Sequence, residues 1–128
     1  LNRYKEEAIL ISKEIKSFLT EINIESECIF FEKDNKNFSL DEIDFVITLG
    51  GDGTVLYAAR LSCKYKIPIF PINLGQFGFI AGIQVDKWQQ DLQLYLEGKS
   101  KLVERSLVCA ELHRNNQTDC DRRRRNLQ

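Results

Sequence analysis

The feature that most constrains the fold is an apolar run that enters a glycine-rich turn and continues as a helix-forming sequence. The run is "DFVITL" at residues 44–49, and the turn that follows it is "GGDGT" at 50–54. β-Branched and aromatic residues bounded by glycine are typical of a buried strand. From Thr54 to Lys64 the composition favours a helix. A strand that passes through a tight turn into a helix predicts an α/β fold.

The rest of the chain repeats this alternation. One helical face near the start combines Tyr4, Ala8, Ile11, Ile15, Phe18 and Ile22. "ECIFF" at 27–31 and "PIFPIN" at 68–73 predict buried strands, and residues 85–96 predict a helix that Gly98 ends. "LVERSLVCAELH" at 102–113 alternates loosely and is a further candidate strand. Such an alternation predicts a Rossmann-like three-layer domain with a mainly parallel sheet.

Two parts are expected along the chain. Residues 1–101 form the α/β domain, and 102–128 form the start of a second domain with an irregular basic tail. The chain opens within the first helical pattern, so the domain is expected to lack its first strand. Trp88 and Tyr95 are predicted on the inner face of the last helix, as core residues.

Charge and cysteine content limit the possible partners. The net charge of −1 leaves no electrostatic footprint for nucleic acid, and the run Arg122–Arg125 is interpreted as part of a basic tail. Cysteines at 28, 63, 109 and 120 form no C-x-x-C pair, so no zinc site is predicted. They are expected to be free thiols in a reducing cytoplasm, those at 28, 63 and 109 as small core residues. No apolar run approaches the ~18 residues of a membrane span, so no membrane partner is expected.

A second glycine turn, "NLGQFGF" at 73–79, follows the strand expected at 68–73. The carboxyl ends of parallel strands form the functional crevice of open α/β sheets, so the two turns share a pocket if their strands are neighbours. "GGDGT" is neither a dinucleotide fingerprint, because Leu56 replaces the third glycine, nor a Walker loop. "GKS" at 98–100 lacks the first glycine of a Walker loop and is interpreted as a helix stop.

Asp52 is the unusual residue of the first turn. Glycine N–H groups and the start of a helix favour phosphate, whereas a carboxylate repels it. The aspartate therefore needs a role of its own, either accepting a proton from a hydroxyl nucleophile or binding a metal that neutralises phosphate charge. The alternative is that Asp52 only caps the helix.

The two motifs together resemble a known family. "LGGDGTVLYAAR" at 49–60, followed by "PIFPINLGQFGFIAGI" at 68–83, resembles the NAD kinases, which phosphorylate the 2′-hydroxyl of the adenosine ribose of NAD to give NADP. "ERSLVCAEL" at 104–112 is similar to the segment where that family enters its β-rich second domain, which is expected to be largely absent here. "GGDGT" alone is shared with diacylglycerol and sphingosine kinases. A lipid kinase and a non-catalytic nucleotide-binding module therefore stay as alternatives, while "NLGQFGFI" favours an NAD kinase.

The resemblance implies roles for individual residues. Asp52 is the expected general base. The expected nucleotide-binding residues are Gly51, Asp52, Gly53, Thr54, Asn73, Gly75, Gly78 and Phe79, with Phe79 near the adenine of NAD. Gln76, Phe77 and Tyr57 depart from the residues common in the family.

The resemblance also implies partners and cofactors. NAD and ATP, or inorganic polyphosphate as phosphoryl donor, are the expected substrates. Mg²⁺ or another divalent cation is expected to be held largely by the phosphates and water, with no metal ligand assigned in this chain. The full-length protein is expected to be a homo-oligomer.

Overall fold

The computed structural model describes residues 3–30, 39–75, 78, 80–106, 113–114 and 117–118. The helices are α1 (Arg3–Glu21), α2 (Asp52–Ser62) and α3 (Trp88–Leu96), with short 3₁₀ turns η1 (Cys63–Tyr65) and η2 (Val85–Lys87). The strands are β1 (Val46–Gly50), β2 (Ile69–Asn73), β3 (Ile83–Gln84), β4 (His113–Arg114) and β5 (Gln117–Thr118). Within these ranges, no helix has the length and apolarity that a bilayer crossing requires.

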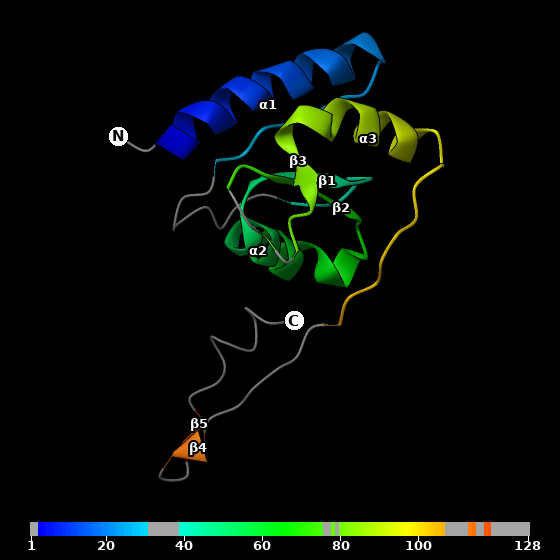
Figure 1. Ribbon diagram of the computed structural model, residues 1–128. Helices are drawn as coiled ribbons and strands as arrows, with labels where there is room; N and C mark the ends of the chain where they lie inside the picture. The colour runs from blue at the N-terminus through cyan, green and yellow to red at the C-terminus, as the bar shows by residue number, and fades with distance from the viewer. Residues whose placement is uncertain are drawn as a thin grey trace.

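A parallel sheet forms the centre of the fold. Its strand order is β1-β2-β3, with Gly50 opposite Asn73 and Ile72 opposite Ile83. Helices α1 and α3 cover one face of the sheet, and α2 covers the other (Figure 1). The three-layer parallel α/β prediction is therefore confirmed. Strands β4 and β5 form a separate antiparallel pair of two residues each.

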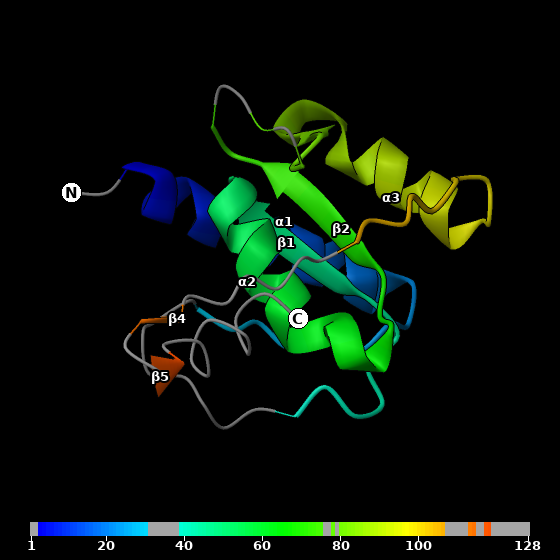
Figure 2. The same cartoon turned by 90° about the horizontal axis from the view of Figure 1, so that it is seen from below.

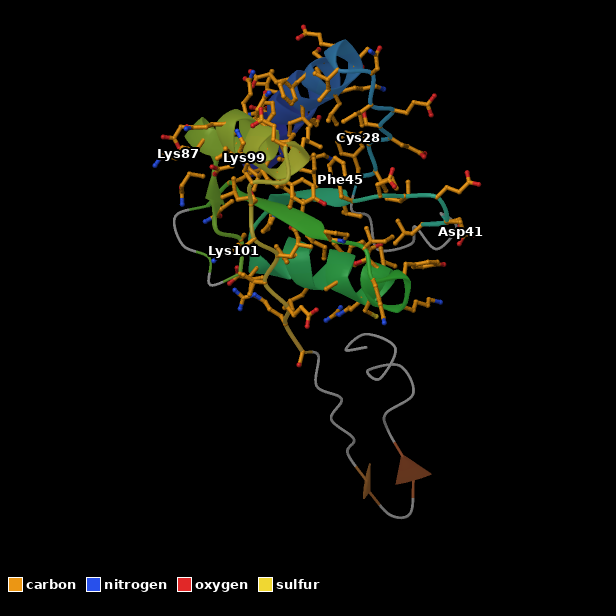
Figure 3. All side chains as sticks on the ribbon, turned by 90° about the vertical axis from the view of Figure 1, so that its right-hand side faces the viewer. Cys28, Asp41, Phe45, Lys87, Lys99 and Lys101 are labelled. Atoms are coloured by element: carbon orange, nitrogen blue, oxygen red, sulfur yellow. The ribbon has the colours of Figure 1, made fainter. Side chains whose placement is uncertain are left out.

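The main core lies between the sheet and the two helices on its α1/α3 face. Its buried members are Ile11, Ile15, Leu19, Phe70, Ile72, Leu74, Trp88 and Leu92. The Trp88 ring meets Phe18 edge-on at 5.8 Å between centroids, and the Tyr95 ring meets Phe45 at 5.5 Å. Figure 3 shows Phe45 in this layer between the sheet and the helices. The predicted inward positions of Trp88 and Tyr95 are confirmed.

The last turn of α1 departs from the predicted apolar face. Leu19 is 3% exposed and belongs to the core, whereas Ile22 is 41% exposed. The helix ends at Glu21, and Asn23 follows with a φ of 62°. The Ile24 N–H bonds the Leu19 carbonyl at 2.8 Å, which closes the helix with the hydrogen bond of a Schellman motif. Ile22 therefore lies beyond the range where helical spacing applies.

The end of α3 confirms that "GKS" is a helix stop. Gly98 has a φ of +74°, a conformation that favours glycine. The Gly98 N–H bonds the Tyr95 carbonyl at 3.0 Å, and the Lys99 N–H bonds the Leu94 carbonyl at 2.9 Å. This pair of bonds is a Schellman motif, in which glycine supplies the left-handed residue.

The strand predicted at 27–31 is wrong over its described part. Residues 27–30 have no regular secondary structure, and Ile29 and Phe30 are 42% and 49% exposed. Composition marks an apolar segment, but a strand also needs a partner, and no described strand pairs with this one. Cys28 is exposed on the same segment (Figure 3), so its predicted core position is also wrong, while Cys63 is partly buried. Phe31, Cys109 and Cys120 lie outside the described residues.

Two further differences concern short strands. Residues 102–106 form no strand and are exposed, and 107–112 lie outside the described residues, so the strand expected from 102 starts too early. Strand β3 has only two residues and was missed, because so short a segment carries no periodic signal.

Candidate functional site

The first glycine turn joins β1 directly to α2. Strand β1 ends at Gly50, and the helix begins at Asp52, two residues earlier than predicted. Gly51 is the N-cap residue, in an extended conformation, with no side-chain cap hydrogen bond. The N-cap residue is thus a glycine, and Asp52 is the first residue of the helix.

The two turns begin side by side. Gly50 and Asn73 are the last paired residues of β1 and β2, and the Leu74 N–H donates to the Gly50 carbonyl at 3.0 Å. Figure 2 shows the two strands adjacent, with α2 packed across them. The expectation that both turns lie at one edge of the sheet is confirmed.

The Asp52 carboxylate connects the first turn to the residues that directly follow the second. Its Oδ1 atom accepts hydrogen bonds from the backbone N–H groups of Ile80, at 3.0 Å, and Ala81, at 3.1 Å. Two backbone donors on one carboxylate oxygen restrict the orientation of the group. Sequence reasoning missed both donors, because a backbone N–H carries no signal in residue identity.

Gly78 fits closely against the same carboxylate. A Cβ atom at this position would lie 2.8 Å from Asp52 Oδ1 and 2.9 Å from the Ala81 carbonyl oxygen. Gly50 is enclosed in a similar way, because a Cβ there would collide with the Thr54 hydroxyl. Glycine at these two positions is required by the protein's own packing.

Gly51 and Gly53 have the opposite surroundings. A Cβ at either position would meet no atom of the described residues within 4 Å. Both stand at the start of α2, where the Gly53 N–H has no acceptor within the helix. An exposed N–H at a helix N-terminus, without side chains above it, is suited to bind an anion such as phosphate.

The second turn is shaped by Asn73. This residue is 3% exposed, and its Oδ1 accepts the Gly75 N–H at 2.8 Å. Such a side-chain-to-backbone bond two residues on is an Asx-type turn. Asn73 therefore orders the turn from within the fold, and Gly75 adjoins it. Gln76, Phe77 and Phe79 lie outside the described residues.

A groove of about 930 Å³ adjoins the first turn. Its walls are β1, α1 and the segments at 24–30 and 39–45, and its lining includes Gly50, Gly51, Thr54, Asn73 and Gly75. Asp52 is not part of the lining, so the groove and the carboxylate are neighbouring but separate features. Thr48, on β1, also lines it, with a buried hydroxyl that has no partner among the described residues.

The described residues offer no dedicated metal centre. Among them, no three or more His, Cys, Asp or Glu side chains gather where they could hold an ion. Magnesium in phosphoryl-transfer sites usually keeps several waters and is bound by one or two carboxylates together with substrate phosphates. A cation that arrives with a nucleotide is compatible with this surface, whereas a resident ion has no ligand cage in the described part.

The sequence matches the ATP-NAD kinase N-terminal domain family over residues 1–100. The chain belongs to the NAD kinase family. Among curated proteins, it is similar to the NAD kinase of Treponema denticola, with 44% identity over 113 residues. It is also similar to the NAD kinases of Treponema pallidum, with 36% identity over 115 residues, and of Solibacter usitatus, with 41% identity over 73 residues.

The matches cover different shares of the two proteins compared. The T. denticola match takes in 88% of this chain and 40% of that NAD kinase, and the T. pallidum match 89% and 38%. The S. usitatus match takes in 57% of this chain and 25% of that NAD kinase. The chain therefore spans less than half the length of these NAD kinases. No solved structure matches it.

Proposed function

We propose that this chain is the N-terminal catalytic part of an NAD kinase, which transfers the γ-phosphoryl group of ATP to the 2′-hydroxyl of the adenosine ribose of NAD. The observation that carries the proposal is the Asp52 carboxylate, held by two backbone N–H groups next to two glycines that leave the backbone accessible. A fixed base beside a phosphate-binding surface is the combination that phosphoryl transfer to an alcohol requires.

The proposed reaction is a single displacement. Asp52 accepts the proton of the 2′-hydroxyl as the hydroxyl oxygen forms a bond to the γ-phosphorus. The bond from that phosphorus to the β,γ-bridging oxygen breaks, and ADP leaves with the electron pair. Because little covalent chemistry falls to the protein in phosphoryl transfer, positioning and charge stabilisation account for most of the catalysis.

The open glycines have the complementary role. With no side chains above them, Gly51 and Gly53 allow phosphate oxygens to approach the backbone, and the positive end of α2 favours their charge. Thr54 lies in the first turn of the helix and contacts Gly50. We assign Asn73, Gly75 and Gly78 to the shape of the second turn, and Phe79 to the adenine on the basis of the family resemblance.

We further propose that the donor is ATP bound to Mg²⁺ or another divalent cation, because such an ion neutralises phosphate charge in phosphoryl transfer and is bound largely by the phosphates and water. The resemblance also supports a cytoplasmic homo-oligomer with neither nucleic acid nor membrane as partner. Residues 1–101 would form the catalytic domain and 102–128 the entry to the next.

A coupled assay tests the proposed reaction. The full-length protein is given MgATP and NAD, and NADP is measured with an NADP-specific dehydrogenase. We expect NADP from the full-length protein and little or none from the 128 residues alone. No NADP, together with phosphorylation of diacylglycerol, would show a lipid kinase instead. Robust NADP formation by the 128 residues would mean that they already contain a complete NAD site.

A further inference from the structure

We infer that Gly78, Ile80 and Ala81 are positioning residues that fix the Asp52 carboxylate through Oδ1 and so orient it for accepting the substrate proton. The second turn is then an anchor for the catalytic group as well as a candidate binding element. This inference rests on the proposed function for the role of Asp52, but the anchor itself can be measured without any turnover.

The hydrogen bonds of Oδ1 fix one side of the carboxylate. A carboxylate oxygen has two lone-pair sites, and Oδ1 accepts the Ile80 N–H at 3.0 Å and the Ala81 N–H at 3.1 Å. Both distances lie in the normal range for N–H···O bonds. A proton arriving at Oδ1 would have to displace one of these donors, so the two bonds hold this oxygen as the fixed side of the carboxylate.

The location of the donors makes the anchor rigid. Ile80 and Ala81 lie between β2 and β3, and both strands are paired within the central sheet. Ala81 is buried, and Asp52 stands on the first turn of the 11-residue helix α2. The carboxylate is therefore held between the start of a helix and the two residues that lead toward β3. Small errors in the position of a reacting group can reduce rates by about 10²-fold.

Gly78 is the residue that permits this contact. A side chain there would approach Oδ1 to 2.8 Å and the Ala81 carbonyl oxygen to 2.9 Å, so either the carboxylate or the donor peptide would move. Gly82 offers a matched control in the same turn. It is exposed, and a Cβ at Gly82 would meet no described atom within 4 Å.

Nuclear magnetic resonance of the 128-residue chain tests the anchor directly. The amide protons of Ile80 and Ala81 should shift with pH at the same midpoint as the Asp52 carboxyl carbon, because they bond that group. We expect this response to be lost in Asp52→Asn and in Gly78→Ala, and kept in Gly82→Ala. Wild-type amides that do not follow Asp52 would overturn the inference, even if Gly78→Ala fails to fold.

Kinetics of the full-length protein test the positioning role. We expect Gly78→Ala to lower kcat by about 10²-fold while the KM for NAD changes by less than about 3-fold, as for an interaction made only in the transition state. Gly82→Ala should leave both near wild type. In the Asp52→Asn background, Gly78→Ala should cause no further loss, because residues that act as a unit are not additive.

The outcomes separate the two proposals. Additive losses in the double variant would show that Gly78 acts independently of Asp52 and would overturn the positioning role. An Asp52→Asn enzyme with normal turnover would remove the proposed base and, with it, the catalytic part of this inference. The amide titration would still decide whether the anchor exists.

Discussion

The glycines of the two turns fall into two groups that the sequence does not distinguish. At Gly50 and Gly78 a side chain would strike Thr54 or Asp52, so these positions are closed by the protein itself. At Gly51 and Gly53 a side chain would meet no described atom within 4 Å. One group serves internal fit and the other leaves room for a ligand. The difference teaches that one motif can carry both requirements in adjacent residues.

Asp52 lies between the closed and the open glycines, and its replacement should have the largest effect. Asp52→Asn keeps the size of the side chain and an acceptor oxygen but removes the base. A positioned general base contributes about 10²–10⁴-fold, so we expect kcat of the full-length protein to fall at least 10²-fold. Thermal unfolding of the variant serves as the control for correct folding. Near-normal turnover by a folded variant would show that Asp52 is not the base.

Replacing Gly50, a closed position, should lower the stability of the protein. Gly50→Ala forces a methyl group against the Thr54 hydroxyl. Overpacking typically costs about 1–3 kcal/mol, which we expect in the free energy of unfolding measured by urea denaturation of the 128 residues.

Two variants sharpen this measurement. Gly51→Ala, at an open position with a φ of −109°, should lower the free energy of unfolding only by the poorer helix cap, about 0.5 kcal/mol. Thr54→Ala removes the hydroxyl that the new methyl would strike, so Gly50→Ala should cost less in that background. Equal losses at Gly50 and Gly51 would erase the distinction between closed and open glycines.

Replacing Gly53, the other open position, should change the stability with the opposite sign. Gly53 lies in the first turn of α2, and glycine in a helix is less favourable than alanine by roughly 0.5–1 kcal/mol. We expect Gly53→Ala to raise the free energy of unfolding by up to that amount, while kcat/KM of the full-length protein falls because the methyl group occupies ligand space. A stabilised variant with unchanged kcat/KM would show that no ligand lies against Gly53.

Much of the fold was predictable because its main elements carry local signals. The run before "GGDGT" became β1, the run before "NLGQFGF" became β2, and Gly98 ends α3 as the sequence indicated. The segment at 27–31 was misassigned because strand formation depends on a partner, which composition does not reveal. Leu19 belongs to the core and Ile22 does not, because the helix ends at Glu21. A helix boundary is set by caps more than by periodicity.

The location of the site could be predicted from the sequence, but its internal hydrogen bonds could not. The shared location of the two turns followed from the rule for parallel strands, and Asp52 stood out by its charge among glycines. The bonds from Ile80 and Ala81 could not be foreseen, because any non-proline residue offers the same N–H group. Gly78 was the available signal, but a glycine needed for clearance and one needed for ligand access look the same in a sequence.

The bonds between Asp52 and the second turn also make two amides unusual reporters of hydrogen exchange. Most protected amides in a sheet exchange when the strand pairing opens. Those of Ile80 and Ala81 depend instead on one side chain that is 28 and 29 residues away in the chain. Their exchange rates therefore measure how often the carboxylate leaves its place while the sheet stays intact. Local opening of the site and global unfolding can be read separately from a single molecule.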